Sequence, residues 1–90
     1  VFFFNDINPQ AKTHILAIPK MSVTDYNDFI SKADNEMIKY FFDKINEIAK
    51  KHGLLDSGFR LVTNSGRDAN QEVPHFHIHI LGGENLKAIK

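Results

Sequence analysis

The sequence predicts an α+β domain in which an antiparallel sheet packs against one long helix. Short segments rich in apolar and β-branched residues lie on both sides of one long segment with helical periodicity. Strands before and after a single helix favour this class of fold. The length of 90 residues and the hydrophobic fraction of 42% are those of one small globular domain. We therefore treat residues 1–90 as a single domain.

Four strands are expected, each ended by turn residues. Their ranges are residues 1–4, 13–18, 59–63 and 73–81. The first is an apolar run typical of a buried strand, Pro19 ends the second, and Gly82 follows the last. Residues 21–30 are predicted to be irregular or to form a short helical turn.

One long helix is predicted to begin at Ser31 and to end before Gly53. The segment Ser31-Lys-Ala-Asp34 resembles a capping box with Ser31 as the N-cap. Apolar residues at positions 37, 38, 41, 42, 45, 48 and 49 form one stripe with a 3.6-residue period. Gly53 is the expected residue just beyond the helix, where a left-handed conformation is common.

Composition excludes several classes of function. Lys and Arg together number 11, as do Asp and Glu, so no basic excess favours nucleic-acid binding. The chain has no cysteine, which excludes disulfides, thiolate metal sites and cysteine nucleophiles and is compatible with the cytoplasm. No apolar run approaches the roughly 20 residues of a membrane span. We expect a cytoplasmic protein with neither a nucleic-acid nor a membrane partner.

Three of the five histidines occupy alternate positions in one apolar run, at His75, His77 and His79. In a strand, such residues share one face and lie about 6.6–7 Å apart at their Cα atoms. Histidine transfers protons near neutral pH, and a neutral imidazole can attack phosphorus to form a covalent intermediate. The pattern therefore indicates a site for phosphoryl transfer.

Two other interpretations of the histidines stay open on spacing alone. Alternate imidazoles on a strand can converge on a zinc ion, although only Glu72 lies near enough in sequence to complete a ligand set. One or two of the histidines could equally be structural residues. We expect free imidazoles and no bound metal.

The run His75-Phe-His77-Ile-His79-Ile-Leu81 resembles the His-φ-His-φ-His-φ-φ motif of the histidine triad (HIT) superfamily, in which φ is apolar. Four further blocks resemble the family in the same order, at residues 6–10, 13–20, 60–64 and 71–75. The glycines after the triad are similar to those of the Hint branch of nucleoside phosphoramidases. The resemblance covers nearly the whole chain and implies a single HIT domain that lacks the family's N-terminal segment.

The resemblance implies a role for each histidine at a matching position. His77 would be the nucleophile that takes the nucleoside monophosphate, and His79 would contact the phosphate and the leaving group. His75 would orient the site, and His14 would lie behind His77 as a supporting partner.

The resemblance also implies a nucleotide-binding set. Asp6 would hold the ribose hydroxyls, although Asp followed by Asn-Pro is also an ordinary turn signal. The other members would wall the base (Phe4, Ile7, Leu16) or contact phosphate and ribose (Asn64, Gln71, Glu72, Val73). The chain departs from relatives at Ala69-Asn70, where a glycine pair is frequent.

The activity implied is hydrolysis of the P–N bond of purine nucleoside 5′-phosphoramidates through a nucleotidyl-histidine, with aminoacyl-adenylates as a second substrate class. No metal or organic cofactor is expected, and the resemblance implies a two-fold homodimer. Two alternatives remain: a dinucleoside polyphosphate hydrolase of the same fold, and a nucleotide-binding partner protein whose turnover is incidental.

Overall fold

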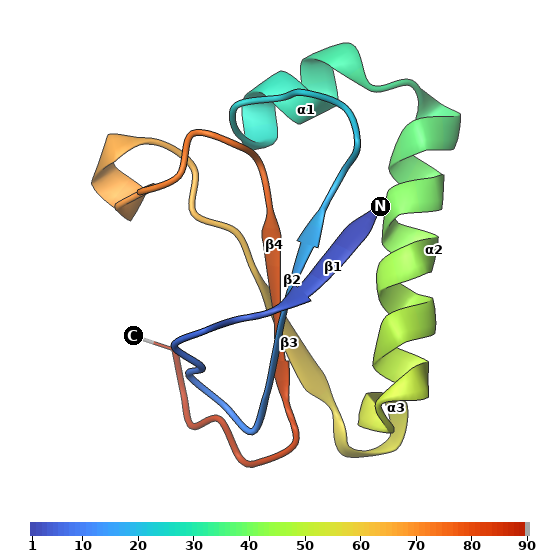
Figure 1. Ribbon diagram of the computed structural model, residues 1–90, viewed down its shortest axis with the longest axis vertical. Helices are drawn as coiled ribbons and strands as arrows, with labels where there is room; N and C mark the ends of the chain where they lie inside the picture. Colours follow the sequence, from blue (N-terminus) through green and yellow to red (C-terminus); the bar gives the residue numbers. More distant parts are fainter. Residues whose placement is uncertain (90) are drawn as a thin grey trace.

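A four-stranded antiparallel sheet forms the centre of the computed structural model, which describes residues 1–89 (Figure 1). Its strands are β1 (Phe2–Asn5), β2 (Thr13–Ile18), β3 (Phe59–Val62) and β4 (Ile78–Gly82). They are ordered β1-β2-β4-β3, and every neighbouring pair is antiparallel. The expected α+β fold with an antiparallel sheet is confirmed.

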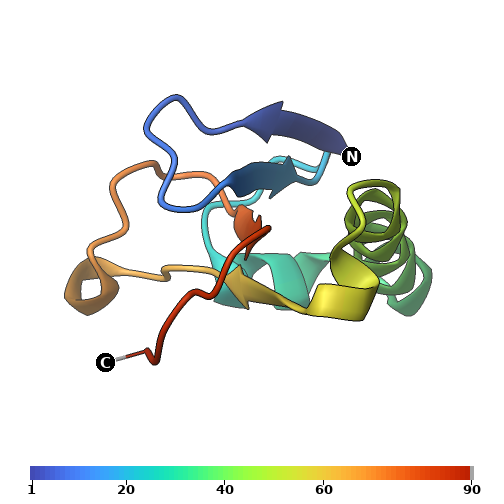
Figure 2. The ribbon, with the colours of Figure 1, turned by 90° about the horizontal axis from the view of Figure 1, so that it is seen from below.

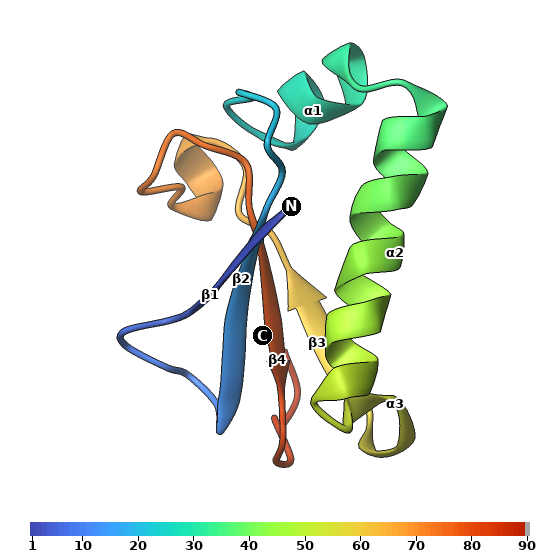
Figure 3. The same ribbon diagram turned by 45° about the vertical axis from the view of Figure 1, so that its right-hand side comes forward.

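The long helix covers one face of this sheet (Figure 3). It is α2 (Asn35–Lys51), preceded by α1 (Tyr26–Lys32) and followed by the short α3 (Leu54–Ser57). The core joins the apolar stripe of α2 to the inner face of the sheet. Its central members are Phe41, Ile45 and Ala49 from α2 and Ile15, Ala17, Ile78 and Ile80 from the strands. No helix within residues 1–89 is both long and apolar enough to span a bilayer.

The predicted start of the long helix was wrong, whereas its end was right. Asp34 is the N-cap, because its carboxylate accepts a hydrogen bond from the Met37 amide at 2.8 Å. Ser31 belongs instead to the last turns of α1, where its hydroxyl donates to the Asn27 carbonyl. Ser31 does not cap a helix because it lies inside α1, which begins at its own N-cap, Asp25. Gly53 follows α2 with a left-handed φ of 72°, as expected.

The first and last strands differ from the prediction, the first in its burial and the last in its start. The first is not buried, because Phe2 and Phe4 project from its outer face and are half exposed. The last begins at Ile78 rather than at residue 73, so His75 and His77 precede it. At these residues the chain has not yet joined the sheet, because the Phe76 amide donates to the Val23 carbonyl, which lies outside any strand, at 2.9 Å. Alternation of burial nevertheless continues from Phe76 through β4.

No α-helix covers the face of the sheet opposite α2 within the described part of the chain (Figure 2). The short 3₁₀ helix η1 (Arg67–Ala69) on that side belongs to the β3–β4 loop. Strand register aligns Phe4, Leu16, His79 and Val62 in one row across this outer face. The β1–β2 loop and the long β3–β4 loop lie on the same side (Figure 2). These two loops and the outer face enclose the site described next.

Candidate active site

A cavity of about 490 Å³ opens on the outer face of the sheet. Its ten lining residues come from β2, β4, the β1–β2 loop and the β3–β4 loop: Asp6, Leu16, Asn64, Ala69, Asn70, Gln71, Glu72, Val73, His77 and His79. Eight of them belong to the predicted site, so the fold brings residues from four separate segments to one place.

Four predicted site residues do not line this cavity. Phe4 is paired with Leu16 in the strand register, but its ring is half exposed, and Ile7 is 91% exposed. His14 is buried behind the cavity, beside His79. His75 is not among the lining residues, and its Nε2 is buried without a hydrogen-bond partner among the described residues. His75 contributes to the site through its main-chain carbonyl, which accepts a hydrogen bond from His77 Nδ1.

Two lining residues were missed, Ala69 and Asn70. They lie where the family resemblance implies a glycine pair, and Asn70 adopts the left-handed conformation with φ of 56°. Asparagine tolerates this region better than most residues, so the loop turns without glycine. The sequence signal was the asparagine itself, at a position where a left-handed residue is needed.

The side chain of Gln71 closes this loop and uses both of its amide hydrogens in doing so. Its Oε1 accepts from the Gly66 amide at 2.8 Å, and its Nε2 donates to the carbonyls of Thr24 and Val73 at 2.7 and 3.1 Å. The loop is thereby tied to the segment before α1. The main-chain N–H of Gln71 is also committed, since it donates to the Gly66 carbonyl at 3.1 Å. Gln71 therefore has no N–H left for a ligand and can only accept from one.

Hydrogen bonding to the main chain sets the tautomer of His77. Its Nδ1 lies 2.8 Å from the His75 carbonyl oxygen. A carbonyl can only accept, so Nδ1 must carry the hydrogen. In the neutral ring, Nε2 then holds a free lone pair. His77 is thus prepared to act as a nucleophile from Nε2.

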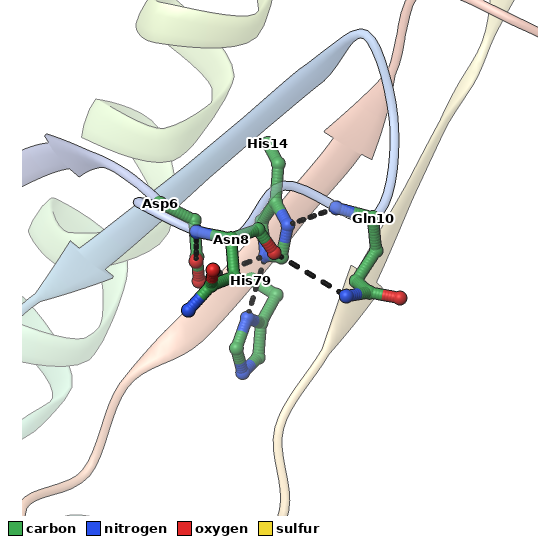
Figure 4. A network of polar contacts seen from close by, with 5 residues as sticks. All are labelled: Asp6, Asn8, Gln10, His14 and His79. Atoms are coloured by element: carbon green, nitrogen blue, oxygen red, sulfur yellow. Dashed lines mark hydrogen bonds and ion pairs between the residues drawn. The ribbon is translucent and has the colours of Figure 1, made fainter.

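A second chain of hydrogen bonds gives His79 the opposite tautomer (Figure 4). The Gln10 amide must donate, and it lies 3.0 Å from His14 Nδ1, so neutral His14 carries its hydrogen on Nε2. That Nε2 is 2.9 Å from His79 Nδ1, which must accept. Neutral His79 therefore carries its hydrogen on Nε2. The two cavity histidines offer one lone pair and one donor, with ring centroids 5.0 Å apart.

The partner of His14 differs from the expected one. The resemblance placed His14 behind His77, but the structure places it against His79, while the His75 carbonyl holds His77. The pKa of His79 is lowered, first by burial and then by repulsion from His77 and His14, and Asp6 offsets part of the effect. A lowered pKa keeps His79 neutral near pH 7, in agreement with the hydrogen-bond chain.

Asp6 serves the turn and also reaches the cavity. Its Oδ1 accepts from the Asn8 amide at 2.8 Å, which is the turn role that the Asp-x-Asn-Pro pattern indicates. Its Oδ2 lies 3.5 Å from His14 Nε2 and takes no closer partner among the described residues. This second oxygen is left to accept hydrogen bonds from a ligand.

Asp6, His14 and His79 could hold a metal ion by distance, since one donor atom from each lies within 4.8 Å of the others. The hydrogen-bond pattern opposes this use. A metal on His14 Nε2 would displace the hydrogen given to His79, and the ring could regain one only on Nδ1, which accepts from Gln10. The arrangement is suited to free imidazoles.

The charges around the cavity are acidic. Asp6 and Glu72 supply two carboxylates, whereas no Lys or Arg of residues 1–89 lines the cavity. A phosphoryl group bound here would rely on imidazole and main-chain donors. Further negative charge on a ligand would meet no lysine or arginine in the lining.

Comparison with known proteins matches residues 1–86 to the HIT domain family. An uncharacterised HIT-like protein of Rickettsia prowazekii (strain Madrid E) is 50% identical over 86 residues, which cover 96% of this chain and 72% of that protein. The purine nucleoside phosphoramidase of Escherichia coli (strain K12) is 40% identical over 83 residues, covering 92% of this chain and 69% of that enzyme.

A solved structure shares the fold. A histidine triad protein from Clostridium difficile aligns with a TM-score of 0.85 and 41% identity, over 98% of this chain and 76% of that one. The alignment therefore includes the sheet, α2 and the cavity.

Proposed function

The chain belongs to the HIT family and is a hydrolase of that family, and on this premise we propose that it cleaves the P–N bond of purine nucleoside 5′-phosphoramidates. Aminoacyl-adenylates are the second substrate class of the proposal. The similar Escherichia coli protein is a purine nucleoside phosphoramidase, which supports this choice. The proposal places the enzyme in the cytoplasm, with which the absence of cysteine is compatible.

The observation that carries the proposal is the pair of opposite tautomers at one cavity. His77 Nε2 attacks phosphorus, the P–N bond breaks, and the leaving nitrogen takes up a proton from solvent to depart as an amine. His79, with hydrogen on Nε2, donates to the phosphoryl group or the leaving nitrogen. Water then attacks phosphorus and the bond from phosphorus to His77 Nε2 breaks. This releases nucleoside monophosphate, returns one proton to solvent and restores the lone pair of His77.

Charge favours a phosphoramidate over a dinucleoside polyphosphate. A polyphosphate would bring additional negative charges past Glu72, and the cavity lining within residues 1–89 has no Lys or Arg to neutralise them. A phosphoramidate ends in a neutral nitrogen and brings no further negative charge to the acidic cavity.

We expect turnover of adenosine 5′-phosphoramidate to exceed that of a diadenosine polyphosphate by about 100-fold or more in kcat/KM, because like-charge contacts cost several kcal/mol. Steady-state kinetics with both substrates tests this. Glu72→Lys should narrow this ratio by raising kcat/KM for the polyphosphate. The ratio for Glu72→Gln should lie between those of the unaltered protein and Glu72→Lys.

The comparison also decides among the alternatives. Faster turnover of the polyphosphate would favour a dinucleoside polyphosphate hydrolase. Tight binding of nucleotide without turnover of either substrate would favour a nucleotide-binding partner protein.

We also propose that the protein is a two-fold homodimer that pairs through the edge strand β3. The sheet order leaves β3 at an edge, where Phe59 and Leu61 are exposed together with Leu55 of α3. An unpaired edge with exposed apolar side chains is a template for another strand. Antiparallel pairing of β3 with its copy satisfies two-fold symmetry.

We expect light scattering at micromolar concentration to give the mass of a dimer. Leu61→Lys should yield monomer, because a lysine on an edge strand opposes pairing. Phe2→Lys, the same kind of change on the exposed face of the other edge strand, is the matched control and should remain dimeric. Monomer in the unaltered protein, or dissociation by Phe2→Lys alone, would contradict pairing through β3.

A further inference from the structure

The segment that carries the nucleophile lies outside the sheet and depends on a few individual hydrogen bonds. Residues 73–77 precede β4, and the β3–β4 pairing already ends at Val62 and His79. The main chain supplies two contacts, from the His75 amide to the Val73 carbonyl at 2.8 Å and from the Phe76 amide to the Val23 carbonyl at 2.9 Å.

Two side chains outside the segment add further contacts: Gln71 Nε2 donates to the Val73 carbonyl at 3.1 Å, and Thr63 contacts His77. The Thr63 hydroxyl donates to the His77 carbonyl at 2.7 Å, in partly buried surroundings. Thr63 directly follows β3, where the ladder with β4 stops. Its hydroxyl thus continues the connection between the two strands by one more bond, at the residue that bears the nucleophilic ring.

We propose that Thr63 is a positioning residue for His77, and the proposal rests on the proposed function. His77 is held at two points: its ring Nδ1 donates to the His75 carbonyl, and its main-chain carbonyl accepts from the Thr63 hydroxyl. Both points must be fixed for Nε2 to stay in line with the phosphorus. Displacements of about 1 Å in such groups cost up to about 100-fold in rate.

Thr63 does not line the cavity, so its contribution acts through His77 and not through contact with the ligand. Loss of the hydroxyl would leave the His77 carbonyl without this partner in a partly buried place, and the main chain would shift to find another. The hydrogen bond from His77 Nδ1 to the His75 carbonyl would then lengthen or break, and the hydrogen could move to Nε2 and block the lone pair.

Two pairs of side chains of similar size, Thr with Val and Ser with Ala, differ in the hydroxyl and so isolate its effect. Threonine and serine both have it, whereas Thr63→Val and Thr63→Ala both lack it. In Thr63→Val and Thr63→Ala we expect kcat for adenosine 5′-phosphoramidate to fall on the order of 10-fold, with little change in KM. In Thr63→Ser we expect kcat to stay near its original value. If Thr63→Val does not fold, the Ser and Ala pair still decides. Unchanged kcat without the hydroxyl, or an equal loss in Ser, would overturn the proposal.

A second readout is independent of activity. Long-range proton–nitrogen NMR of the imidazole rings reports which nitrogen of His77 carries the hydrogen, and His77→Ala assigns its signals. The unaltered protein and Thr63→Ser should show the His77 hydrogen on Nδ1 alone. The spectra of Thr63→Val and Thr63→Ala should also show the tautomer with the hydrogen on Nε2. This spectrum tests Thr63 even if the wild-type protein does not hydrolyse phosphoramidates; identical ring signals in all four proteins would refute its role.

Discussion

His77→Ala is expected to abolish turnover, with a loss of about 10⁴-fold or more in kcat, as for other enzymes that lose their nucleophile. His77 is the cavity histidine with a free lone pair, since its Nδ1 is committed to the His75 carbonyl. His79 cannot replace it, because its Nδ1 accepts from His14 and its Nε2 carries a hydrogen. Steady-state kinetics measure the loss, and nucleoside monophosphate should still bind within a few fold.

Two further measurements make this prediction specific. Mass spectrometry of the unaltered enzyme during turnover should find a nucleotidyl group on His77. His52→Ala is the matched control, because His52 caps α2 through its main chain and lies outside the cavity. Near-native turnover by His77→Ala, or an adduct on another residue, would show that the mechanism is wrong.

Sequence patterns predicted a helix or strand correctly where the pattern was compatible with only one local structure. The segment 13–18 has a β-branched run ended by proline, and β2 has those bounds. The stripe of α2 buries Phe41, Ile45 and Ala49 as the helical period requires. The start of α2 failed because two capping signals, Ser31 and Asp34, lay three residues apart, and only the presence of α1 decides between them.

Eight of the ten residues that line the cavity were among those predicted from the sequence, but the hydrogen bonds between them were not. Alternation correctly separated the histidines from the buried Phe76 and Ile78. It could not show that the strand starts only at Ile78, because that depends on where β3 and β2 stop pairing. For the same reason, the pairing of His14 with His79 and the bond from Thr63 could not be predicted, since both depend on contacts between distant segments.

Asp6→Asn is expected to weaken ribonucleotide substrates about 10- to 150-fold in kcat/KM, since hydrogen bonds to a charged acceptor are worth roughly 1.5–3 kcal/mol. The proposal gives the free Oδ2 to the ribose hydroxyls, while Oδ1 holds the Asn8 amide. Asparagine is the chosen change because its carbonyl oxygen can keep the bond to Asn8 and so preserve the turn. Kinetics with a ribose substrate and with its 2′,3′-dideoxy counterpart, in both proteins, give the four values needed.

The comparison of the two sugars separates the ribose contact from every other effect of Asp6. Asp6 lies 3.5 Å from His14 Nε2, so its replacement also alters the field at the pair of His14 and His79. That effect is common to both sugars and cancels in the ratio of the two losses. A dideoxy substrate has no hydroxyl to lose, so its kcat/KM should fall much less. Equal losses on both sugars would mean that Asp6 acts only through the turn and the histidines, and the ribose would then have to be held by other groups of the cavity.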